Sequence, residues 1–122
     1  LEMLKSRFSN YNDGIVYIVK KKQKSTDFNA AKNALSRDDL EEVVKLAYEE
    51  KSKRDEDIEF ASSQGRTLSL KIKTRSYKVD PTLKAIAGDT LYSIIKLDHD
   101  RAKQEMYIYL EEERKLSDGV NT

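Results

Sequence analysis

The fold is decided by three segments, RTLSLKIKTR (residues 66–75), KAIAGDTLYSIIKLDHD (84–100) and KQEMYIYLEEER (103–114). Apolar and polar residues alternate in the first and the last of them, with the period of two that a half-buried strand requires. The middle segment is rich in β-branched and aromatic residues and contains Gly88, where the chain can reverse at no steric cost. Together the three segments predict an antiparallel meander with one side facing water.

The rest of the chain adds further short elements. A strand is predicted at 15–19, and a short helix at 37–42 is predicted to pass into a strand at 43–50. A second helix is predicted within 53–64, because this segment begins with acidic residues and ends at Gly65. We therefore expect a mainly β fold with minor α content. It is a small antiparallel β-barrel or strongly curved sheet of about six strands, with one or two short helices, one of them capping an open end, and a long loop.

Length and composition bound the organisation of the chain. Its 122 residues predict a single domain with a core at about 14–114, and flexible tails are expected at 1–12 and 115–122. Hydrophobic residues make up 38% and charged residues 37%, so the core is small and neighbouring subunits are a candidate source of further burial. The net charge of +1 gives no general bias towards nucleic acid or membranes.

Composition also excludes several classes of site and of location. The absence of cysteine excludes disulfides and thiolate metal sites. No apolar run is long enough to span a membrane, and no signal-peptide pattern is present, so we expect synthesis as a soluble intracellular chain.

Asp98, His99 and Asp100 form the one cluster that suggests metal chemistry, and a metal-dependent hydrolase is one hypothesis. Neighbours on an extended strand point to opposite sides, so the three side chains converge only at a sharp turn. A polar hairpin loop at 98–103 explains them without a metal. No second histidine, isolated carboxylate or glycine-rich phosphate loop is present, and we expect no enzyme activity, no metal and no cofactor.

Two groups of residues are candidate interface residues: the lysines Lys20, Lys21, Lys22 and Lys24, and the tyrosines Tyr107 and Tyr109. The lysine run either binds phosphate or forms a solvated strand end or loop. The tyrosines lie on the face opposite Met106 and Ile108 and precede three glutamates, which favours contact with protein over phosphates. A second hypothesis is a small-barrel nucleic-acid-binding module that uses 20–24 and the face formed by Lys71, Lys73 and Arg75.

A longer part of the chain, residues 46–114, resembles a known family. LAYEEKSKRDEDIEFASSQGRTLSLKIKTR (46–75) contains a strand, an acidic-aromatic helix and a strand that ends in basic residues. IAGDTLYSIIKLDHD (86–100) places Tyr92 and Ile94 after a glycine turn and before an Asp-rich turn, and QEMYIYLEEER (104–114) is similar to a closing strand. In this order the segments resemble the head-closure (head–tail joining or adaptor) proteins of long-tailed bacteriophages.

The resemblance implies a structural virion protein with a small β-barrel-like fold, a helix and a long mobile loop. Such a protein forms a homo-oligomeric ring beneath the portal and its adaptor, closes the head, and docks the tail-completion proteins. DNA passes through the ring only as cargo, and no membrane is involved. The implied location is the virion, and the cytoplasm of the bacterial host during assembly. The isolated chain can be a monomer in this scheme.

Overall fold

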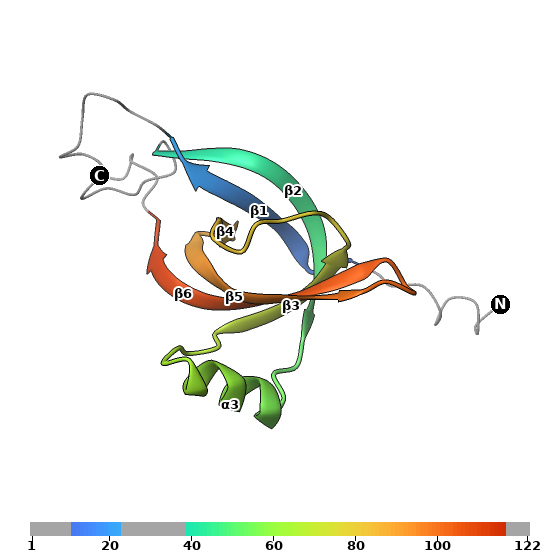
Figure 1. Ribbon diagram of the computed structural model, residues 1–122. Helices are drawn as coiled ribbons and strands as arrows, with labels where there is room; N and C mark the ends of the chain where they lie inside the picture. Colours follow the sequence, from blue (N-terminus) through green and yellow to red (C-terminus); the bar gives the residue numbers. More distant parts are fainter. Residues whose placement is uncertain (1–10, 23–38, 117–122) are drawn as a thin grey trace.

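The computed structural model describes residues 11–22 and 39–116 (Figure 1). Six strands and one helix follow one another along the chain. Their bounds are β1 Gly14–Lys21, β2 Leu40–Lys51, α3 Asp55–Ser63, β3 Leu70–Arg75, β4 Lys84–Ala87, β5 Thr90–Asp100 and β6 Glu105–Lys115.

The six strands close into a barrel in the order β1-β2-β3-β6-β5-β4, and every neighbouring pair is antiparallel. The expected mainly β fold with six strands and a minor helical part is therefore confirmed. Closure removes most of the open strand edges that a curved sheet of this size would expose.

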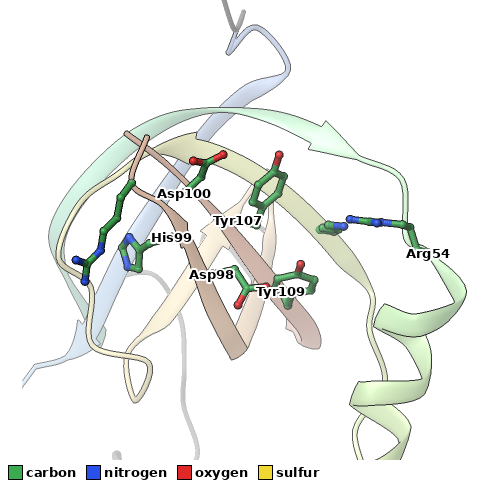
Figure 2. A pocket seen from close by; sticks show the side chains of 8 residues that line it. Arg54, Asp98, His99, Asp100, Tyr107 and Tyr109 are labelled. Atoms are coloured by element: carbon green, nitrogen blue, oxygen red, sulfur yellow. The ribbon is translucent and has the colours of Figure 1, made fainter. Parts of the chain in front are cut away.

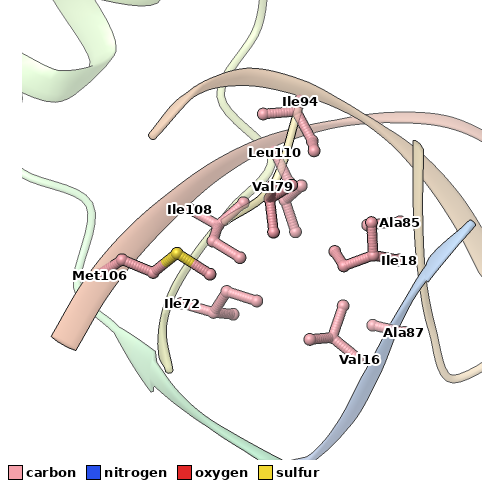
Figure 3. Packing of buried hydrophobic residues seen from close by; sticks show 10 residues of the cluster. All are labelled: Val16, Ile18, Ile72, Val79, Ala85, Ala87, Ile94, Met106, Ile108 and Leu110. Carbon is pink, nitrogen blue, oxygen red and sulfur yellow. The ribbon is translucent and has the colours of Figure 1, made fainter. Parts of the chain in front are cut away.

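Along each strand, every second side chain points inward, and these side chains fill the barrel interior. Ile72 of β3 lies opposite Ile108 of β6, and both side chains are fully buried. Val79 enters the same core from the segment between β3 and β4, so this connection also packs against the barrel interior (Figure 3). The buried residues of the cluster are Val16, Ile18, Ile72, Val79, Ala85, Ala87, Ile94, Met106, Ile108 and Leu110.

Two hairpin turns join the strands of the C-terminal half. Gly88 has a φ of 65° between the paired residues Ala87 and Thr90, as the predicted reversal requires. The β5–β6 turn begins after Asp100, and its Gln104 takes a left-handed φ of 56°. The prediction of a loop at 98–103 was therefore wrong at its start, because β5 continues pairing with β6 to its last residue.

The prediction of a short helix at 37–42 was also wrong for residues 40–42, which belong to β2. Leu40 begins β2 and pairs with Lys21, so pairing with β1 prevails over the local helical pattern. Two residues of the expected tails contact the barrel, and the flexibility of the tails stays a prediction. The Tyr11 hydroxyl donates to Glu105 Oε2 at 2.7 Å, and Leu116 is buried beside Leu91.

The sequence had suggested that a helix caps an open end of the barrel, but helix α3 does not do so. Its Ala61 packs on Leu68 and on Tyr109, whose side chain points outward from β6. The helix therefore lies on the outside of the barrel wall, below β3 in Figure 1. In residues 11–22 and 39–116, no helix has the length and apolar character needed to cross a bilayer.

Candidate functional site

The outer wall formed by β3, β6 and β5 carries a compact set of charged and aromatic side chains, which we call the tyrosine face. The strand register brings them together, since Tyr109 pairs with Lys71 and Lys96 on its two sides, and Tyr107 pairs with Lys73 and Asp98. Met106, Ile108 and Leu110 alternate with these tyrosines and point into the core. The tyrosine face consists of Lys71, Lys73, Lys96, Asp98, Tyr107 and Tyr109.

Helix α3 is fixed to the tyrosine face by a buried ion pair. Lys71 Nζ lies 2.8 Å from Asp57 Oδ2, and the two residues are only 3% and 7% exposed. The same ammonium group lies 5.5 Å and 5.3 Å from the ring centroids of Tyr107 and Tyr109. Burial opposes ionisation of Asp57, but its hydrogen bonds with Lys71 and the Arg54 N–H prevail and lower its pKa.

A second cation extends this arrangement to β5. Lys96 Nζ lies between the rings of Phe60 and Tyr109, at 4.5 Å and 4.7 Å from their centroids, and 3.3 Å from Asp98. Burial is the main cause that raises the pKa of Tyr109, and the negative charges of Asp57 and Asp98 raise it further. The phenol of Tyr109 is therefore held in its neutral form by its surroundings.

The basic face that the sequence suggested for nucleic-acid binding is largely neutralised. Lys73 Nζ lies 3.2 Å from Glu49 and 3.7 Å from Glu105. Burial alone would lower the pKa of Lys73, but the hydrogen bond to Glu49 and the two negative charges raise it. Lys71 is buried against Asp57, so neither lysine presents a free charge to a phosphate backbone.

An open groove of about 430 Å³ runs along the tyrosine face towards the β5–β6 hairpin. In Figure 2, Asp98 lies beside Tyr109, and Tyr107 lies above them in the view. Its lining residues are Arg54, Lys71, Asp98, His99, Asp100, Arg101, Tyr107 and Tyr109.

The two tyrosines that we named as interface candidates differ in accessibility. Tyr109 is 5% exposed because Ala61 and Leu68 of the same chain cover it, so it offers a partner little surface, and its place in an interface stays a prediction. Tyr107 is half-buried and lines the groove, so it remains accessible to a partner.

Asp98, His99 and Asp100 do not converge. Asp98 pairs with Tyr107 on the outer face, whereas His99 pairs with Met106 and brings its Nδ1 to 3.0 Å from Ser76 Oγ. Figure 2 shows the His99 ring away from both tyrosines. Within residues 11–22 and 39–116, no three His, Cys, Asp or Glu side chains are grouped so that they could hold a metal ion.

The lysine run lies at the end of β1. Lys20, Lys21 and Lys22 are exposed, and the Lys22 N–H donates to the Asp39 carbonyl at 3.0 Å. Lys24 lies outside the described residues. The three described lysines are thus available to a partner, and they lie outside the grooves lined by Arg75, Tyr77 and Tyr107.

Sequence reasoning missed the part of α3 that contacts the barrel. Its buried residues are Asp57 and Ala61, one charged and one small, so a search for a stripe of large apolar residues does not find them. The available signal was their spacing of four, which places both on one side of a helix facing Lys71.

The alkaline stability of the protein tests the environment of Tyr109. A folded-state pKa above the ordinary value of 10.0 gives stability that is present below pH 10 and is lost as the pH rises further. We expect Tyr109→Phe to make the melting temperature fall less steeply between about pH 9 and pH 11. Tyr48 and Tyr92, whose pKa burial also raises, account for a remaining slope.

The matched control is Tyr77→Phe, because this ring is 47% exposed. It should keep the wild-type slope. Equal slopes for Tyr109→Phe and the wild type would show that the phenol of Tyr109 ionises as freely in the folded chain as in the unfolded one.

The sequence matches no protein-family model and no curated protein.

Proposed function

We propose that this protein is a structural, non-enzymatic virion component of the head-closure kind, which forms a ring beneath the phage portal and docks the tail. Two kinds of observation support the proposal. The segments 46–75, 86–100 and 104–114 resemble that family, and the small barrel with one outer helix agrees with the fold that the resemblance implies. Its partners would be copies of itself, the portal or adaptor proteins, and tail-completion proteins.

The observation that carries the proposal is a pair of exposed apolar side chains on α3, which lie on the two flanks of its buried side. Ile58 and Phe60 are 45% and 39% exposed on a helix of nine residues, although the helix is held firmly to the barrel. Contiguous exposed apolar patches are typical of protein contact sites, and we propose that one partner covers both side chains. The Asp57–Lys71 pair fixes their position, so a partner would meet a surface that is already formed.

A second apolar surface lies on another wall of the barrel. Ile15 of β1 and Val43 of β2 are 43% and 44% exposed. β1 is separated from β6, on which α3 packs, by two strands in either direction around the barrel. Figure 1 shows α3 and the β1–β2 wall on opposite sides of the molecule. Two different surfaces are what a head-to-tail contact needs, and such a contact forms a ring when the rotation from one copy to the next closes.

Electron microscopy of the protein mixed with its portal complex tests the proposed function. We expect rings of this protein on the portal, and a mass for the complex that corresponds to many copies. A protein that stays monomeric in the presence of the portal and has no affinity for it would overturn the proposal.

Single substitutions test the two surfaces of the ring. We expect Ile58→Glu and Ile15→Glu each to abolish rings while leaving the fold intact, because both side chains are solvent-exposed. In a head-to-tail contact, a mixture of the two variants still forms pairs, since each contributes one intact surface. Mass photometry should therefore detect pairs in the mixture and only monomers for each variant alone.

Tyr77→Glu is the control for this series. Among residues 11–22 and 39–116, Tyr77 is the most exposed large hydrophobic residue, at 47%, and it belongs to neither surface. The Tyr77→Glu variant should still form rings. Loss of rings in this control, or intact rings in both test variants, would contradict the assignment of the two surfaces while leaving the portal experiment to decide the function.

A further inference from the structure

A cluster of unpaired cations lies at the end of the barrel where the β5–β6 hairpin turns. Arg75 and Arg101 line a single open cavity of about 330 Å³ together with Ser76 and Gln104. Arg75 ends β3 and Arg101 follows β5, so one guanidinium group comes from a strand end and the other from the hairpin turn.

Neither arginine has a carboxylate partner within the part of the chain that the structure describes. Glu105 pairs with Arg75 in the strand register, but its carboxylate is engaged by the Tyr11 hydroxyl at 2.7 Å and by Lys73 at 3.7 Å. Asp100, which precedes Arg101, accepts the Lys103 N–H at 3.2 Å. The nearest carboxylates are thus used locally, in contrast to the paired lysines of the tyrosine face.

Backbone hydrogen bonds fix the frame that carries these side chains. The Ser76 N–H donates to the Gln104 carbonyl at 3.0 Å, which ties the end of β3 to the hairpin turn. The Gln104 N–H donates to the Arg101 carbonyl at 3.3 Å within that turn. The two arginines therefore start from backbone positions that are held relative to each other.

A second cavity of about 390 Å³ adjoins the first and shares Ser76 and Arg101 with it. Lys78 lines this cavity, and no described residue forms an ion pair with it. The neighbouring carboxylate of Asp80 accepts hydrogen bonds from the Thr82 N–H and hydroxyl, both at 2.9 Å. Tyr77, 47% exposed, completes a strip with cations along its length and an aromatic ring beside them.

We propose that this strip binds the phosphodiester backbone of single-stranded nucleic acid. Guanidinium forks match the oxygens of a phosphate, and Arg75 and Arg101 are free to use them. The two adjoining cavities are open, which suits successive phosphates of a polymer better than a small enclosed ligand. An exposed tyrosine beside a cationic strip is the combination that binds single strands without sequence preference, through stacking and charge. The site is independent of the proposed ring, because it lies within one chain.

Fluorescence anisotropy with a labelled, mixed-sequence single-stranded oligonucleotide tests the site on the full chain. We expect binding that weakens between about 50 and 200 mM salt. The double variant Arg75→Gln/Arg101→Gln should bind about tenfold more weakly, which is the order expected for two lost ionic contacts at an exposed site. The slope of log affinity against log salt concentration should become shallower by about 1.4, which is about 0.7 for each of the two phosphate contacts that are lost.

Lys45→Gln/Arg114→Gln is the charge-matched control, since both residues are exposed and form no ion pair among the described residues. It should retain the wild-type slope. A melting temperature equal to that of the wild type would show that the test variant is folded. The variant Arg75→Lys/Arg101→Lys retains the positive charges but not the guanidinium forks, so it should bind with intermediate affinity.

Four results would overturn the proposal. The first three are no binding by the wild type at low salt, equal losses in the test and control doubles, and displacement of the oligonucleotide by polyglutamate at equal charge concentration. The third result would assign the strip to an acidic protein segment instead. The fourth result, loss of binding only in Lys20→Gln/Lys21→Gln/Lys22→Gln, would move the contact to the end of β1 and would also reject this strip.

Discussion

Replacing Lys71 by Met is expected to destabilise the protein by about 3–5 kcal/mol, the cost of leaving one partner of a buried ion pair without the other. Methionine retains most of the side-chain volume, so the change removes mainly the charge. Asp57, 7% exposed, would then lie against Tyr109 without the ammonium group that is now 2.8 Å away. Urea unfolding at pH 7 measures the difference in the free energy of unfolding.

The double variant Lys71→Met/Asp57→Ala removes both charges. It therefore distinguishes the free-energy cost of losing the ion pair from the cost of burying one unpaired charge. It should recover most of the stability, because apolar replacement of both partners is often neutral. A deficit of about 1 kcal/mol should remain, since Asp57 also accepts the Arg54 N–H at 3.1 Å at the start of α3. Additive effects of the two single changes would contradict an energetically coupled pair.

Lys51→Met provides the control for this cycle. Lys51 lies 3.8 Å from Glu49, and both side chains are about one-third exposed, at 35% and 32%. Such a pair contributes about 0–1 kcal/mol, so its loss should be small. A large effect at Lys51 would mean that removal of any lysine from the barrel strands is destabilising, whatever its burial.

The strand faces of this protein could be predicted from its sequence because burial follows alternation. Ile72 and Ile108 were expected on apolar faces, and they meet in the core. The other face of the same strands was harder to predict. Alternation placed Lys71 and Tyr109 on a solvated side, but α3 covers that side, and it does so through a charged residue and a small one.

The boundary of the β5–β6 hairpin shows a second limit of local patterns. Asp98, His99 and Asp100 have the composition of a loop, yet they continue β5 along β6 to Glu105. A polar strand that projects along a hairpin has no buried side to mark it, so composition alone favours a turn. The unpaired state of Arg75 could not be predicted either, because it depends on Glu105 being engaged by Tyr11, 94 residues away in sequence.

Ile108→Ala is expected to cost about 2–5 kcal/mol, as truncation of a fully buried isoleucine does when the surrounding core cannot close over the cavity. Ile108 is 0% exposed and lies between Ile72 on β3 and Leu97 on β5. Hydrogen bonds around a closed barrel hold these walls apart, so the vacated volume should persist.

Three isoleucine variants together decide whether the barrel is rigid enough to keep that cavity. Ile108→Val should cost about 0.5–1.5 kcal/mol, whereas Ile15→Ala, at a side chain 43% exposed, should stay within about 1 kcal/mol. Urea unfolding with an unchanged m-value would confirm that the native state alone is affected. If Ile108→Ala cost no more than Ile15→Ala, the walls would have to collapse onto the missing side chain. Because the native free energy of unfolding of a single domain is about 5–15 kcal/mol, one such residue accounts for a large share of the stability of the fold.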